Sequence, residues 1–153
     1  MNHPGFGRRL LLVGLFAFAS ASATPPRITV IGAWTRPAAA GMNAAGYMTI
    51  ANHDGFPDRL MGAASPMAAR VSLHRSRKVG NVSIMRPIDG IDVTSHGRTS
   101  LAPGGFHLML EGLKRPLRPG ERAPVTLQFQ RAGPVRAWLT VRSGPAAATG
   151  MKM

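Results

Sequence analysis

Short runs of alternating apolar and polar residues, separated by turn residues about every ten positions, most constrain the fold of this chain. Residues 125–130 alternate most regularly, and residues 135–141 place Val, Ala, Leu and Val on one face. Alternate side chains of an extended strand point to the same side. No segment has the 3.6-residue period of a helix of three turns. The pattern therefore predicts an all-β domain.

Other segments predict strands in the same way. They lie at residues 28–34, 47–51, 71–74, 82–85 and 106–111, with weaker ones at 59–64, 91–93 and 99–101. Short strands joined by frequent turns are typical of sandwiches and barrels. We expect a Greek-key β-sandwich or barrel of about eight or nine short antiparallel strands.

The first 23 residues have the form of a secretory signal peptide. Arg8 and Arg9 precede an apolar run at residues 10–19, and small residues follow at 20–23. A membrane span needs about twenty apolar residues, so the alternative of a retained anchor is disfavoured. We predict an exported periplasmic protein with a signal peptide at 1–23, a β domain at 24–142 and a flexible tail at 143–153.

The charge is strongly basic, with 19 Lys and Arg against 6 Asp and Glu and a net charge of +13. The basic residues are scattered along the chain, and export argues against nucleic acid as a partner. A solvated basic surface is the simplest interpretation, and attraction to anionic lipid headgroups or to an acidic partner is the alternative. The chain has no cysteine, which excludes disulfides and the thiolate ligand of a blue-copper centre.

Four residues predict a site for a soft metal ion: His74, Met85, His107 and Met109. Ten residues separate His74 from Met85, and twenty-one separate Met85 from His107. In each predicted strand the candidate ligand lies on the face opposite the apolar residues, which leaves the methionines without a packing role. Imidazole and thioether donors without a carboxylate suit Cu(I), whereas calcium and magnesium require oxygen.

With these residues the chain resembles the periplasmic copper chaperones called PCuAC. Their motif is His, ten residues, Met, twenty-one residues, His-x-Met, and the resemblance extends over residues 28–141, including the segments 33–36, 46–50 and 103–110. The resemblance implies a cupredoxin-like fold and Cu(I) bound by His74, Met85, His107 and Met109. It also implies delivery of copper for cytochrome c oxidase assembly, with a copper-accepting periplasmic protein or an oxidase subunit as partner.

The chain departs from this family in two places. Arg75 follows His74 where many members have Glu, so we expect more positive charge near the site. Some members have a C-terminal tail rich in His and Met that takes Cu(II). Here the tail ends with Met151 and Met153 and contains no histidine, so nothing in the sequence supports a Cu(II) site.

We expect no enzymatic activity, because the chain lacks H-E-x-x-H, G-x-S-x-G and a phosphate-binding loop. Two alternatives to a copper chaperone stay open. One is a metal-free exported β-sandwich module that binds another protein. The other is a passive copper buffer that stores the ion without donating it to a partner.

Overall fold

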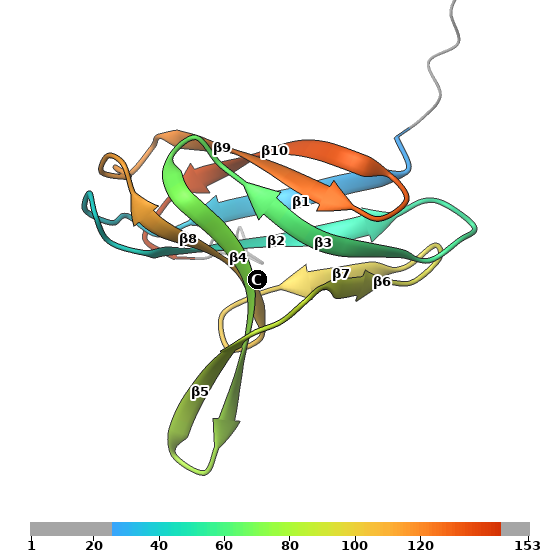
Figure 1. Ribbon diagram of the computed structural model, residues 1–153, viewed down its shortest axis with the longest axis horizontal. Helices are drawn as coiled ribbons and strands as arrows, with labels where there is room; N and C mark the ends of the chain where they lie inside the picture. The colour runs from blue at the N-terminus through green and yellow to red at the C-terminus, as the bar shows by residue number, and fades with distance from the viewer. Residues whose placement is uncertain (1–25, 145–153) are drawn as a thin grey trace, which may run out of the picture.

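The computed structural model describes residues 26–144, and these residues form ten β-strands and no helix (Figure 1). The strands are β1 (Ile28–Thr35), β2 (Ala44–Asn52), β3 (Asp58–Ala64), β4 (Ala68–Val79), β5 (Val82–Pro87), β6 (Ile91–Val93), β7 (Arg98–Leu101), β8 (Phe106–Leu113), β9 (Arg122–Phe129) and β10 (Gly133–Val141). The all-β prediction is confirmed. The predicted signal peptide and most of the predicted tail lie outside the described residues.

Seven strands close into a barrel. Neighbours pair in the order β4, β8, β2, β1, β10, β9 and β3, and the pairing of β3 with β4 completes the ring. β5 extends the sheet beside β4, β6 pairs with β3, and β7 pairs with β2 and β8. Within the described residues, no helix has the length and apolar character needed to cross a membrane.

Two details differ from the sequence expectation. There are ten strands rather than eight or nine, because the weak segments at 91–93 and 98–101 both pair as short strands. The barrel is also mixed rather than purely antiparallel, since β1 runs parallel to β10 and β7 runs parallel to β8. Alternation reports which face a side chain occupies and says nothing of which strand lies beside it.

The barrel interior is apolar. Leu108 and Leu110 of β8 point inward and are completely buried, as is Leu139 of β10. The inward face predicted for residues 135–141 is confirmed by Ala137, Leu139 and Val141, all of which are buried. Inward packing of these residues leaves the other face of β8 free for polar side chains.

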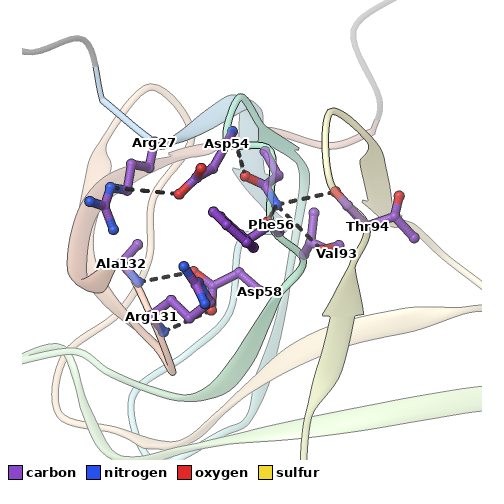
Figure 2. Close-up of polar contacts among 9 residues, drawn as sticks. Arg27, Asp54, Phe56, Asp58, Val93, Thr94, Arg131 and Ala132 are labelled. Carbon is purple, nitrogen blue, oxygen red and sulfur yellow. Dashed lines mark hydrogen bonds and ion pairs between the residues drawn. The ribbon is translucent and has the colours of Figure 1, made fainter.

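Polar side chains join the loops at one end of the barrel (Figure 2). Asp58, at the start of β3, accepts hydrogen bonds from the backbone N–H groups of Arg59, Arg131 and Ala132 at 2.7–2.9 Å. The buried Asn52 donates to the carbonyl oxygens of Phe56 and Thr94. These bonds connect the start of β3 to the β9–β10 turn, and the end of β2 to the segment after β6.

The β4–β5 hairpin projects away from the barrel (Figure 1). β4 pairs with β8 through its first half and with β5 through its second half. Gly80 at φ 61° begins the two-residue turn, where a left-handed backbone is accessible to glycine without strain. The predicted metal ligands lie where this hairpin leaves the barrel.

Candidate metal centre

Strand pairing brings all four predicted ligands to one face of the sheet. His74 of β4 lies directly opposite His107 of β8, and their ring centroids are 5.7 Å apart. Met109 lies opposite Ser72, two residues before His74, and Met85 of β5 lies opposite Ser76, two residues after it. Opposed residues of an antiparallel pair and their diagonal neighbours share a face and are within side-chain reach.

The four side chains differ in exposure. His107 is 2% exposed, Met109 is half-buried, and Met85 on the edge strand β5 is 50% exposed. The His74 side chain is 15% exposed. Solvent exposure of the candidate ligands therefore increases from the buried imidazole of His107 on the barrel to the half-exposed thioether of Met85 on the hairpin.

His107 has one ring nitrogen occupied and one without a partner. Its Nδ1 lies 3.2 Å from the carbonyl oxygen of Gly105, which can only accept, so Nδ1 carries the proton. Its Nε2 is buried and has no hydrogen-bond partner. When one ring nitrogen is held in this way, the lone pair of the other is available to a ligand, as in metal-ligating histidines.

His74 is held by a relay of side chains. Its Nε2 lies 2.9 Å from Ser72 Oγ, and that hydroxyl donates to Glu111 Oε1 at 2.9 Å. Ser72 donates its single hydroxyl proton to the carboxylate of Glu111, so His74 Nε2 must donate to Ser72 Oγ. The Nδ1 lone pair of His74 is therefore free, and this buried atom also has no partner.

Arg70 completes the relay. Its Nε donates to Glu111 Oε2 at 2.6 Å. The hydrogen bonds from Arg70 and then from Ser72 lower the pKa of Glu111 below its usual 4.5, so the carboxylate stays ionised and accepting. A carboxylate behind a ligating histidine fixes its ring orientation and raises its basicity.

Burial favours the neutral form of His107. Desolvation lowers the pKa of His107 below 6.5, the neighbouring His74 lowers it further, and the Gly105 hydrogen bond opposes both. A histidine must be neutral to ligate a metal ion. The environment of His107 therefore favours the state that binds.

Arg75 does not face the site. Its guanidinium lies over the Phe106 ring, 5.2 Å from the centroid, on the side of β4 opposite His74. The positive charge expected near the site is therefore carried on the other face of β4, because adjacent residues of a strand point to opposite faces.

Sequence reasoning missed the residues that hold the histidines, chiefly Ser72 and Glu111. Ser72 is two residues before His74, and Glu111 is two residues after Met109, so period-two alternation places both on the ligand face. Tyr47 was also missed. Its ring lies 6.3 Å from His107 and 4.8 Å from Trp34, and it forms the barrel-side wall of the site.

Within residues 26–144, no group of three or more His, Asp and Glu side chains is placed to hold a metal ion. The candidate centre offers two nitrogen donors, so the two thioethers are needed to complete a four-ligand set. That donor set suits a soft, monovalent ion.

Residues 28–141 match the model of the family described as "Putative lipoprotein LpqE-like". The chain belongs to the LpqE-like family. It is also 34% identical over 124 residues to "Putative lipoprotein Lxx21020" of Leifsonia xyli subsp. xyli, a match that covers 77% of this chain and 74% of that protein.

Solved structures confirm the resemblance to PCuAC proteins and the cupredoxin-like barrel. The copper-bound PCuAC domain from PmoF2 is 28% identical with a TM-score of 0.64, covering 77% of this chain and 94% of that domain. The Cu(I) form of DR1885 from Deinococcus radiodurans is 31% identical with a TM-score of 0.58, covering 82% of this chain and 84% of that one.

Proposed function

We propose that this protein is a periplasmic copper(I) chaperone that delivers its ion for cytochrome c oxidase assembly. The observation that carries the proposal is the pair of buried, unpartnered ring nitrogens, His74 Nδ1 and His107 Nε2, on one sheet face with Met85 and Met109. The copper-bound PCuAC domain and Cu(I)-DR1885 support copper as the cargo.

The four donors would hold Cu(I) without adding charge. Two neutral imidazoles and two thioethers leave the ion with its full positive charge, and such a site binds less tightly than one built from thiolates. Weaker binding suits a protein that passes its ion on. The ionised Glu111 lies behind His74 and would stabilise the complex through the relay without touching the ion.

The exposure gradient gives an order of release. Met85 is half exposed on the edge strand, whereas His107 is buried against the barrel. An acceptor ligand would reach the ion from the Met85 side and displace that thioether first. His107 would leave last, because it is anchored at Gly105 and walled by Tyr47.

Leucine substitutions test the thioethers. Leu conserves the volume of Met and removes the sulfur, so Met109→Leu and Met85→Leu should preserve the fold. Each should weaken Cu(I) binding about tenfold or more in a competition titration with a chromogenic chelator. Met61→Leu, on an exposed methionine of β3, is the matched control. Unchanged affinity in both ligand variants would reject the site.

A further inference from the structure

Along one face of the β4–β5 hairpin, the side chains change from apolar at the tip to cationic near the barrel. Three cross-strand pairs share this face: Val79 with Val82 at the tip, Arg77 with Ile84 in the middle, and Arg75 with Arg86 near the barrel. Val79 is 50% exposed and Val82 is 62% exposed. The hairpin therefore presents an apolar tip followed by cationic side chains, on the side away from Met85.

The hairpin arginines have no acidic partners. None of the ion pairs among residues 26–144 includes Arg75, Arg77 or Arg86. Arg75 and Arg86 are placed directly opposite each other, and like charges in that position destabilise a sheet. The contact of Arg75 with the Phe106 ring offsets part of this cost, but no ion pair between described residues offsets the rest.

The three arginines line a common hollow of about 280 Å³ together with Ile84, Pro87 and Ile88. Guanidinium groups bind phosphate through paired hydrogen bonds. The hollow is open to solvent and includes the Arg77–Ile84 pair, which is next to the Val79–Val82 pair on this face of the hairpin. Its chemistry fits a phosphate group that is attached to an apolar phase.

We propose that the β4–β5 hairpin docks this protein on an anionic phospholipid surface. Val79 and Val82 enter the boundary of the acyl chains, and Arg77, Arg75 and Arg86 bind headgroup phosphates. The sequence of polarity along the hairpin matches the depth profile of a membrane interface. A protein interface would instead place apolar residues at the centre with charges around them.

Docking in this way leaves the metal centre accessible. Met85 is on the opposite face of the hairpin and three residues from Val82, which is about 10 Å along a strand. The proposed ligands would face water close to the membrane, where a membrane-bound acceptor could reach them. Lipid binding itself requires no copper, so it is tested separately from the proposed function.

The experiment measures partition of the copper-free full chain into vesicles by sedimentation. Vesicles of phosphatidylglycerol mixed with phosphatidylcholine are compared with pure phosphatidylcholine. We expect stronger binding to the anionic vesicles than to pure phosphatidylcholine, and a difference that decreases as salt rises. All variants share the apolar run at residues 10–19, so its contribution cancels when variants are compared.

Matched charge variants locate the surface. Arg77→Gln with Arg86→Gln should lower the partition coefficient about 25-fold, since each cation at an anionic surface contributes about 1 kcal/mol, or about fivefold. The control pair Arg98→Gln with Arg136→Gln removes the same charge from exposed positions on β7 and β10. It should change the coefficient far less.

A tip variant separates insertion from charge attraction. Val79→Ser with Val82→Ser should lower partition about tenfold while the salt dependence is retained. Equal losses in the hairpin and control charge pairs would overturn the proposal in favour of diffuse attraction by net charge. Absence of binding to anionic vesicles would also overturn it and would leave the arginines as a face for an acidic protein.

Discussion

At the scale of single residues, the site depends on which ring nitrogen carries the proton. His107 is fixed by a backbone carbonyl, and His74 is fixed by a hydroxyl whose own proton is committed to Glu111. The two histidines lie on the same face of the sheet, and each has one buried ring nitrogen without a hydrogen-bond partner. The proposed histidine ligands would therefore be oriented by groups that lie outside the ligand set.

Breaking the relay should misorient His74. Glu111→Gln removes the obligatory acceptor, so Ser72 can donate to His74 and the imidazole can adopt the other tautomer. We expect about tenfold weaker Cu(I) binding. In the copper-free protein, ¹⁵N chemical shifts of His74 should move from the Nε2–H tautomer toward a mixture.

Two comparisons control this prediction. Glu121→Gln removes a carboxylate that pairs with Arg115 away from the site and should leave both readouts unchanged. Ser72→Ala removes the hydroxyl itself and should reproduce the tautomer change. A purely structural role for Glu111 would lower stability and leave the His74 tautomer as it is.

Acid should destabilise the fold through His107. Its pKa is lowered in the folded state, so below the unfolded value of 6.5 the unfolded chain binds more protons. The stabilisation is complete above about pH 6.5 and is lost as the pH falls toward the folded pKa. The free energy of unfolding from urea titrations should therefore decrease between about pH 7.5 and about pH 5.

The variant His107→Gln removes this titration and should flatten the slope in that window. Glu111 does not add to the change in unfolding free energy over that pH range, since its stabilising effect is lost only below its usual pKa of 4.5. Cu(I) affinity should decline over the same acid range, because protons compete for the imidazoles. An affinity that is constant from about pH 8 to about pH 5 would contradict a two-histidine site.

At the scale of secondary structure, β4 and β8 are the elements that create the centre. Their inward residues, including Leu73 and Leu108, pack in the core, and this packing fixes the register that sets His74 opposite His107. A slip of one residue would exchange the two faces of a strand. The hydrophobic core thereby specifies the position of the polar site.

Asp58 joins loops at one end of the barrel, where its carboxylate accepts hydrogen bonds from three backbone N–H groups (Figure 2). Asp58→Ala leaves these donors without that acceptor and should lower the free energy of unfolding by about 1–3 kcal/mol. Thermal unfolding measures the loss. Asp89→Ala removes an exposed acid after β5 and should have little effect, and an equal loss there would argue against the role of Asp58.

At the scale of the whole molecule, deletion distinguishes the proposed chaperone from a passive copper buffer. Only the loss of a chaperone should deprive cytochrome c oxidase of copper. Deleting the gene should lower cytochrome c oxidase activity when copper is scarce, and added copper should restore it. A strain that carries Met109→Leu should behave like the deletion, whereas Met61→Leu should behave like the native protein. Full oxidase activity in the deletion strain at low copper would reject the donor role.

The amino-acid sequence alone determined the all-β class, the strand faces and the four candidate ligands. These are properties of local alternation, so they can be read from residues close in the chain. Seven of the ten strands are recognisable from their apolar positions. The spacing of His107 and Met109 alone places their side chains on the same face.

The tertiary structure decided which strands become neighbours, and with that the rest of the site. Pairing of β4 with β8 and β5 joins residues 74, 85 and 107 from distant segments, and the parallel contact of β1 with β10 helps to close the barrel. The tautomers of both histidines and the outward side of Arg75 follow from these neighbours. Pairing of strands far apart in sequence is a long-range choice made by packing of the common core, which local periodicity does not encode.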